Sequence, residues 1–285
     1  MEHAICAVFA HNEERDIETC LDSITRQFQG KIFVLINGCT DNTFDVVTRY
    51  SKIHNTVVPV DIKVGDKSNA WNVFVHEINI EAEHYFFVDG DCTVEDSAFN
   101  LALSKFEKLR ESKLNGIACT PKETTKNRVK QTHEMIKEGQ LAGNFYALTN
   151  HFIKRVRCHN IYLPIGTIGE DGLVGALAFW DLKPFSKWDL EKVHVAKDIK
   201  FDYRTLSIFN SHDLKLYYRR KIRYSERFFQ NKIITECFRD KGLSWLSGRI
   251  SDLYEHYEPL LKVRFRGVNT YFDWIALRAL KRQFK

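Results

Sequence analysis

The stretch Tyr85-Phe86-Phe87-Val88-Asp89-Gly90-Asp91 is an apolar run that ends in two carboxylates separated by one glycine. Such a run predicts a buried strand that presents Asp89 and Asp91 at its exposed end. The two side chains point the same way in an extended chain, and Gly90 allows the backbone to approach a ligand closely. Paired carboxylates here favour a divalent cation that carries a diphosphate. The alternative is an ordinary acidic turn, because Asp-Gly is common in turns.

The composition indicates a globular protein with a sizeable core, since 44% of the 285 residues are apolar. No run of about 18 apolar residues occurs, and the N-terminal sequence lacks a basic region followed by a long apolar one. We therefore expect neither a secreted nor a membrane-spanning protein. The seven cysteines are dispersed without a C-x-x-C pair, which fits a reducing compartment and predicts a cytoplasmic location.

Charge is distributed unevenly along the chain. Residues 214–285 contain 17 Lys and Arg against 7 Asp and Glu, a net charge of +10, which leaves −5 on residues 1–213. A basic C-terminal region indicates an anionic partner, which is a phosphate, an acidic lipid or a nucleic acid. Arg219, Arg223 and Arg227 recur every four residues there and would form one cationic stripe on a helix, or simply a solvated basic face.

Strands alternate with helices in the first part of the chain. We expect strands at 5–10, 31–36, 57–60, 85–88 and 116–120, and helices at 13–28, 42–50, 67–80, 96–109, 129–141 and 173–180. Asn12 is the predicted N-cap of the first helix. This alternation predicts a mostly parallel sheet, in which ligands bind beyond the carboxyl ends of the strands. Asn12, Asn37 and Asp89 all fall at that edge.

Five motifs occur in a characteristic order. They are Asn12-Glu13, Asn37-Gly38-Cys39-Thr40-Asp41-Asn42-Thr43, Lys67-Ser68-Asn69-Ala70-Trp71-Asn72, Asp89-Gly90-Asp91 and Glu170-Asp171. This order resembles the family-2 glycosyltransferases with the GT-A fold, over roughly residues 4 to 230. The resemblance implies an α/β fold with a mostly parallel central sheet flanked by helices. It implies a catalytic domain over 1–213, with a nucleotide-binding half (1–92) and an acceptor-binding half (93–213), followed by a basic, mainly helical extension (214–285).

The resemblance also implies roles for single residues. The nucleotide would contact Ala10, Asn12, Glu13, Asn37, Lys67 and Asp89. Asp89 and Asp91 match the D-x-D that holds Mn²⁺ or Mg²⁺ against the donor diphosphate. Asp171 matches the catalytic base that takes the acceptor proton, with Glu170 as its orienting or acceptor-binding neighbour. Taken by themselves, outside this set of motifs, Lys67 would be a solvated lysine at a helix start, and Glu170-Asp171 an acidic cap on the helix that follows.

The chain departs from the family pattern at several positions. Phe9 and His11 replace the usual proline and tyrosine, and Asn37 replaces an aspartate that typically binds the base, so UDP, CDP, GDP and dTDP all stay open. For a third metal ligand we favour His194 over His212, because Val193 and Val195 flank His194 as in a strand. Each histidine is otherwise explained as an ordinary polar or hydrogen-bonded side chain.

We therefore expect an inverting, metal-dependent glycosyltransferase that moves a sugar from a nucleotide-sugar to a glycan, glycolipid or other hydroxyl acceptor, in cell-surface glycan or glycolipid assembly. The stretch Tyr224-Ser225-Glu226-Arg227-Phe228 lacks the glutamine and tryptophan of the Q-x-x-R-W motif of processive synthases, so we expect one or a few sugar additions.

Two other functions remain open from the sequence. One is a nucleotidyltransferase acting on a sugar phosphate, and the other is a non-catalytic protein that binds anions or nucleic acid. We expect no nucleic-acid partner, because no recognised motif for one is present. The C-terminal stretch 274–285 mixes apolar and basic residues at helical spacing, so a peripheral contact with the inner face of a membrane is an alternative to packing on the protein body.

Overall fold

The structure, a computed structural model, describes residues 2–205, 211–246 and 248–283. It divides into two compact units. The first comprises Met1–Asn160 and Glu170–Arg204, and the second comprises Ile161–Gly169 and Thr205–Lys285. No helix within the described part of the chain is both long enough and apolar enough to cross a membrane.

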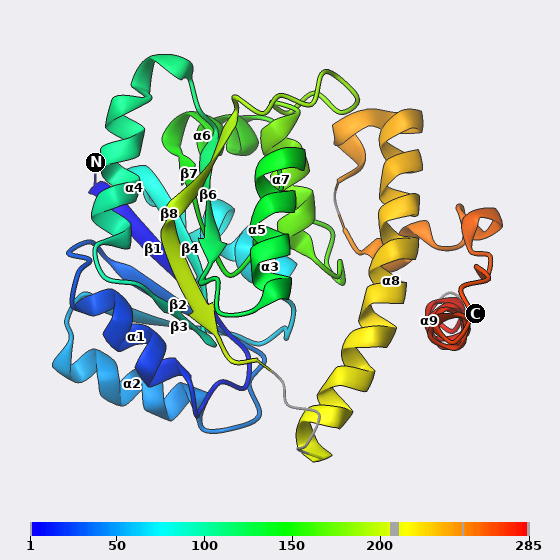
Figure 1. Cartoon of the computed structure of the whole chain (residues 1–285), viewed down its shortest axis with the longest axis horizontal. Helices are drawn as coiled ribbons and strands as arrows, with labels where there is room; N and C mark the ends of the chain where they lie inside the picture. Colours follow the sequence, from blue (N-terminus) through cyan, green and yellow to red (C-terminus); the bar gives the residue numbers. More distant parts are fainter. Residues whose placement is uncertain (1, 206–210, 247, 284–285) are drawn as a thin grey trace. The chain divides into compact units, whose positions relative to one another are not determined.

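The first unit is built on an eight-stranded sheet in the order β3-β2-β1-β4-β7-β6-β8-β5 (Figure 1). Its strands are β1 (Glu2–Ala10), β2 (Ile32–Asn37), β3 (Val57–Ile62), β4 (Ala82–Asp89), β5 (Cys92–Val94), β6 (Gly116–Pro121), β7 (Phe145–Thr149) and β8 (Val193–Tyr203). Within these ranges β7 and β5 run against the other six strands. The prediction of a mostly parallel sheet flanked by helices is confirmed.

Helices cover both faces of this sheet. They are α1 (Ile17–Thr25), α2 (Thr43–Ile53), α3 (Lys67–Asn72), the π-helix η1 (Val73–Ile78), α4 (Ala98–Lys108), the 3-10 turn η2 (Arg110–Ser112), α5 (Lys126–Glu138), α6 (Asn150–Cys158) and α7 (Glu170–Phe179). Phe86 of β4 packs on Phe99 of α4, with ring centroids 4.9 Å apart, whereas Phe87 packs on Phe74 of η1 at 5.6 Å. Because adjacent strand residues point to opposite faces, α4 and η1 lie on different sides of the sheet.

The carboxyl ends of the first strands meet at one edge, as the sequence predicts. Phe9 pairs with Asp89 and Ala10 with Ile36. The structure shows a further reason for a glycine at position 90. Its N–H donates to the carbonyl oxygen of Phe9 at 2.8 Å, and a Cβ at this position would lie 2.9 Å from the same oxygen. The glycine therefore allows the D-x-D turn to pack against β1.

Local differences from the prediction have physical causes. The first helix begins at Ile17 rather than Glu13, because Asn12 adopts a left-handed conformation with φ of 59°. Asn12 is therefore not the N-cap, and that prediction is wrong. The helix expected at 67–80 is α-helical only to Asn72 and then continues as a π-helix. The last expected helix begins earlier, at Glu170, so both residues of the E-D pair lie in its first turn.

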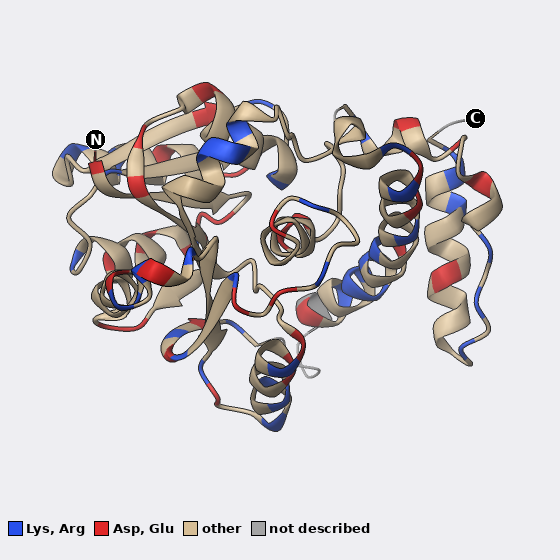
Figure 2. Ribbon diagram, turned by 90° about the horizontal axis from the view of Figure 1, so that it is seen from above, with Lys and Arg blue, Asp and Glu red and all other residues tan. Residues whose placement is uncertain are grey.

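The second unit is mainly helical, and the predicted basic helical extension is confirmed. It contains α8 (Ser211–Lys241), α9 (Asn269–Lys281) and the 3-10 turns η3 (Gly242–Trp245), η4 (Ile250–Leu253) and η5 (Glu258–Leu260). Lysine and arginine residues follow one another along α8 (Figure 2). The segment 161–169 is attached to this unit by Gln230, whose side chain accepts from the N–H of Ile168 at 2.7 Å and donates to the carbonyl of Gly166 at 2.9 Å.

Candidate active site

The loops after β1 and β2 are tied to each other by hydrogen bonds. The Oδ1 atom of Asn12 accepts from the N–H of Thr40 at 2.7 Å. The N–H of Glu13 donates to Oγ1 of Thr43 at 2.8 Å. Thr43 is itself held by Asp41, whose Oδ1 accepts from the Thr43 hydroxyl at 2.6 Å. These contacts fix Glu13 at the carboxyl edge of the sheet, and they give Asn12 a structural role in joining the two loops.

Asn37 is hydrogen-bonded through its side chain to the backbone of its own strand and of the neighbouring strand. Its side chain is buried, and its Nδ2 atom donates to the carbonyl of Ala10 at 2.9 Å and to that of Leu35 at 3.4 Å. Nδ1 of His11 lies 2.7 Å from the Asn37 carbonyl oxygen. A carboxylate at this position could not donate these hydrogen bonds. The asparagine that stands in place of the usual aspartate therefore stabilises the end of β1 through its amide hydrogen bonds.

Lys67 brings together two motifs that are far apart in the sequence. It lies at the start of α3, which Asp66 caps by accepting from the N–H of Asn69 at 2.8 Å. The Lys67 Nζ atom lies 2.5 Å from Asp89 Oδ1 and 2.9 Å from Glu170 Oε1. Burial opposes the charge on this ammonium, but the surrounding carboxylates outweigh it and raise the pKa of Lys67 well above its usual value. Lys67 is therefore a charged bridge between the D-x-D and the E-D pair.

Carboxylates outnumber cations around this bridge. Burial raises the pKa of Asp89 to about 7; Lys67 lowers it in part, and Asp91 and Glu170 raise it again. Burial also raises the pKa of Glu13 to about 8, with the charges of Asp91, Asp16, Asp89 and Asp41 acting in the same direction. A carboxyl whose pKa is raised by like charges is stabilised in its ionised form by a nearby cation. The edge is therefore electrostatically suited to an added positive charge.

The carboxylates at this edge fit a cation that is bound partly by the protein and partly by a substrate. No group of three or more His, Cys, Asp or Glu in the described residues is arranged to hold a metal ion alone. Mg²⁺ sites in proteins, however, commonly use one or two carboxylates, and water and substrate phosphates provide the other ligands. A pocket of about 260 Å³ adjoins Asp91 and is lined by Asp16, Thr19, Asp91, Cys92, Thr93, Asp202, Tyr203 and Arg204.

His194 is not brought to this group. It lies in β8 and pairs with Ile117 of β6. β8 approaches the D-x-D turn only at its other end, where Tyr203 pairs with Cys92, the residue after Asp91. His194 is the second residue of β8 and lies at the opposite end of that strand, and β6 and β7 separate it from β4. Burial and the nearby Lys105 lower the pKa of His194. The geometry does not support His194 as a ligand shared with Asp89 and Asp91, and the side chain of His212 lies outside the described residues.

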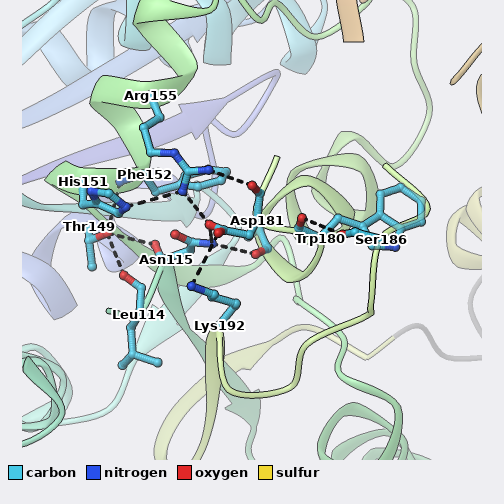
Figure 3. Close-up of polar contacts among 11 residues, drawn as sticks. Leu114, Asn115, Thr149, His151, Phe152, Arg155, Trp180, Asp181, Ser186 and Lys192 are labelled. Carbon is cyan, nitrogen blue, oxygen red and sulfur yellow. Dashed lines mark hydrogen bonds and ion pairs between the residues drawn. The ribbon is translucent and has the colours of Figure 1, made fainter. Parts of the chain in front are cut away.

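Helix α7 carries the E-D pair. Glu170 is nearly buried beside Lys67, and Asp171 Oδ2 accepts from the N–H of Gly143 at 3.2 Å. At the other end of the helix, Asp181 Oδ1 accepts from Arg155 Nη1 at 2.5 Å and from Asn115 Nδ2 at 3.0 Å (Figure 3). Both ends of α7 are therefore attached to the body of the first unit, which fixes where the two carboxylates lie.

Gly143 and Asn144, which lie just before β7, contact both motifs although no sequence pattern indicates it. The Asp89 N–H donates to the Asn144 carbonyl at 3.0 Å, and the Asn144 side chain lies 3.2 Å from Cys92 Sγ. A Cβ on Gly143 would lie only 2.8 Å from the Asp171 Cβ. The Gly-Asn pair ahead of the apolar run 145–148 is a turn signal that predicts a strand start, but it gives no indication of contact with either motif.

Solved structures share this architecture. The mannosyltransferase PcManGT from Pyrobaculum calidifontis, in complex with GDP-Man and Mn²⁺, matches with a TM-score of 0.62 and 15% identity, over 98% of this chain and 75% of that one. TarS 1-349 from S. aureus matches with a TM-score of 0.59 and 16% identity, over 99% and 80%. Glucosyl-3-phosphoglycerate synthase from Mycobacterium tuberculosis, in complex with Mn²⁺, UDP-Glc and phosphoglyceric acid, matches with a TM-score of 0.50 and 16% identity, over 78% and 79%.

The fold is therefore that of the GT-A glycosyltransferases. The sequence profile of glycosyl transferase family 2 matches residues 6–168, which is more than half of the chain and includes the first four motifs. The protein belongs to glycosyl transferase family 2 and is a glycosyltransferase. A search among curated proteins finds no significant match.

Proposed function

We propose that the protein is an inverting, divalent-metal-dependent glycosyltransferase that moves a sugar from a nucleoside-diphosphate donor to an acceptor hydroxyl. The observation that carries the proposal is the Lys67 bridge, because it sets Asp89 of the D-x-D and Glu170 of the E-D pair within 2.9 Å of one ammonium. A donor-binding motif and an acceptor-activating motif must lie this close for direct transfer. The family assignment favours glycosyl transfer over nucleotidyl transfer or nucleic-acid binding.

In the proposed reaction, Asp171 accepts the proton of the acceptor hydroxyl as its oxygen bonds to the anomeric carbon. The bond from that carbon to the phosphate oxygen breaks, its electron pair leaves with the nucleoside diphosphate, and the anomeric configuration inverts. The Gly143 N–H orients the Asp171 carboxylate, and Lys67 orients Glu170, which would contact the acceptor. Asp91 and Asp89 would hold Mn²⁺ or Mg²⁺, which when bound would supply positive charge to offset the charge growing on the leaving diphosphate.

The nucleotide would occupy the loops after β1 and β2. Ala10, Asn12, Glu13 and Asn37 are the proposed contacts there, and we propose residues 1–92 as the nucleotide-binding half and 93–213 as the acceptor-binding half. The neighbours' GDP-Man, UDP-GlcNAc and UDP-Glc define a first donor panel. The proposed acceptor is a glycan, glycolipid or other hydroxyl compound in cell-surface glycan assembly. We place the protein in the cytoplasm, peripheral to the inner face of the membrane.

A thermal-shift screen of UDP, GDP, CDP and dTDP, each with and without Mn²⁺, tests the donor site. A ligand at 100 times its Kd stabilises the native state by about 2.7 kcal/mol. We expect one nucleotide to stabilise the protein in a Mn²⁺-dependent manner, and Asp91→Asn to remove the Mn²⁺-dependent part.

Asp96→Asn is the matched control, because this exposed aspartate lies just beyond the motif and pairs with the exposed Arg26. Its variant should retain the full nucleotide shift. The proposed donor site is wrong if no nucleoside diphosphate stabilises the protein. It is also wrong if Asp96→Asn and Asp91→Asn reduce the Mn²⁺-dependent thermal shift by the same amount.

A further inference from the structure

The α9 surface, which consists of Phe265, Val268, Tyr271, Trp274 and Arg278, presents large apolar side chains to solvent. Phe265 is 93% exposed, Val268 85%, Tyr271 52% and Trp274 50%. Tyr271, Trp274 and Arg278 lie at positions i, i+3 and i+7 of α9 and so share one side of the helix. Single exposed apolar residues are ordinary, but a group of this kind indicates an interaction surface.

The exposure of Phe265 is fixed by its two neighbours. Arg264 Nε donates to Asp273 Oδ2 at 2.8 Å, and Arg266 Nη2 donates to Asp273 Oδ1 at 2.7 Å. The Asp273 side chain is fully buried, and the hydroxyl of Ser225 on α8 also donates to it at 2.6 Å. Because both arginines turn inward, the phenyl ring between them faces outward. An ordered ion-pair network thus holds an aromatic ring in solvent.

The charge around this surface is mainly positive. Residues 259–283 contain six Lys and Arg and one acidic residue, Asp273, which is buried between its arginines. The guanidinium of Arg278 lies 5.4 Å from the Trp274 ring centroid. Glu258, just before this stretch, pairs with Lys281 at 2.9 Å. The exposed Lys262, Arg278 and Arg282 still leave a net positive charge beside the exposed apolar residues. A partner of negative charge with an apolar interior matches this combination.

We propose that the α9 surface docks on a bilayer containing anionic lipids. Trp and Tyr favour the boundary between headgroups and acyl chains, apolar side chains insert below it, and Lys and Arg pair with anionic headgroups. A second copy of the chain fits less well, because a two-fold contact would face two positive surfaces toward each other. This inference names the surface behind the peripheral location in the proposed function, and it does not depend on the transfer chemistry.

The test is co-sedimentation of the full-length protein with vesicles of phosphatidylcholine alone, or of phosphatidylcholine mixed with phosphatidylglycerol. We expect binding to the mixed vesicles that weakens as salt is added. The double variant Phe265→Ser/Trp274→Ser should bind more than about tenfold more weakly, since two aromatic side chains are lost. Arg278→Gln should weaken binding about fivefold.

The double variant Lys52→Gln/Ile53→Ser is the matched control, because Ile53 on α2 is 81% exposed and Lys52 beside it is also exposed. It should bind as the unaltered protein does. Equal loss in this control, or no binding to the mixed vesicles, overturns the proposal. Self-association by light scattering that the Phe265→Ser/Trp274→Ser variant abolishes, without vesicle binding, assigns the surface to a second copy instead. Circular dichroism and the nucleotide thermal shift, measured on each variant, report folding and donor binding separately.

Discussion

Each of the two units contains an ion-pair centre, and the ratio of acidic to basic groups is opposite in the two. In the first unit, the single ammonium of Lys67 lies between Asp89 and Glu170, and burial with neighbouring carboxylates raises the pKa of Asp89 to about 7. In the second unit, the single carboxylate of Asp273 lies between two arginines. Burial would raise its pKa, but hydrogen bonds from Arg264, Ser225 and Arg266 outweigh burial and lower it to about 2.

The difference distinguishes the proposed functional centre from a structural one. The Asp273 network is closed, because its carboxylate is fully buried and both oxygens accept from arginine. The Lys67 centre is partly exposed and has more negative charge than its own cation compensates. An uncompensated group of carboxylates next to a pocket is the arrangement expected where a cation and a substrate bind. Removing a carboxylate should therefore affect mainly activity in the first centre and mainly stability in the second.

The largest expected effect is that of Asp171→Asn in the first unit. Loss of the proposed general base should lower kcat for the active donor of the panel by about 10³-fold. The nucleotide thermal shift should stay unchanged, because Asp171 is not a proposed nucleotide contact. Asp96→Asn serves as the control in steady-state assays, and full activity in Asp171→Asn would remove this residue from the mechanism.

Asp273→Asn in the second unit should give the next largest effect. Removing the charge of one partner in a buried ion pair typically lowers the free energy of unfolding by about 3 kcal/mol. Urea denaturation measures this change. Glu258→Gln is the control, because its pair with Lys281 is exposed and should contribute less than about 1 kcal/mol. The nucleotide shift should persist in both variants; a loss of it in Asp273→Asn would contradict the division of roles.

The pH dependence should distinguish the two centres as well. Glu13 and Asp89 have raised pKa values, so the native state holds more protons than the unfolded state between about pH 4 and pH 8. Their contribution to stability is present below about pH 4 and is lost as the pH rises through 7 to 8. Asp273 has a lowered pKa, so its contribution is present above about pH 4 and is lost as the pH falls toward 2.

Cation binding should follow the opposite trend from the stability contributed by Glu13 and Asp89, because metal ligands must be ionised. Mn²⁺ affinity, measured by titration in the thermal-shift assay, should rise about tenfold from about pH 6 to about pH 8. Glu13→Gln should reduce the part of this rise above pH 7, because an ionised Glu13 adds negative charge beside Asp89 and Asp91. An affinity that is the same at both pH values would contradict the raised pKa of Asp89.

Gly143→Ala should give the smallest effect. The added Cβ would lie 2.8 Å from the Asp171 Cβ and displace this carboxylate slightly, which should lower kcat about fivefold. The control is the double variant with Asp171→Asn, in which Gly143→Ala should cause no further loss. A further fivefold loss in that background would show that Gly143 acts through another residue.

Much of the site could be predicted because it is encoded locally. Asp89 and Asp91 directly follow an apolar strand, and the ends of neighbouring parallel strands must meet at one edge, so the sequence alone predicts Asn12, Asn37 and Asp89 at that edge. The confirmed fold has the same origin. The N-cap prediction for Asn12 is wrong, because its side chain instead accepts from the N–H of Thr40 in the loop after β2. Composition alone gives no sign of such a contact.

The sequence alone determined the order of strands and helices, the family motifs and the concentration of positive charge in the C-terminal region, since each depends on residues that are neighbours in the chain. The tertiary structure decided which charges meet. Lys67 reaches Glu170 only because α7 returns to the edge of the sheet, Gly143 touches Asp171 only because β7 runs against β4, and His194 is separated from Asp89 by two intervening strands. Distances between residues far apart in sequence depend on packing of the whole sheet, and local patterns do not contain that information.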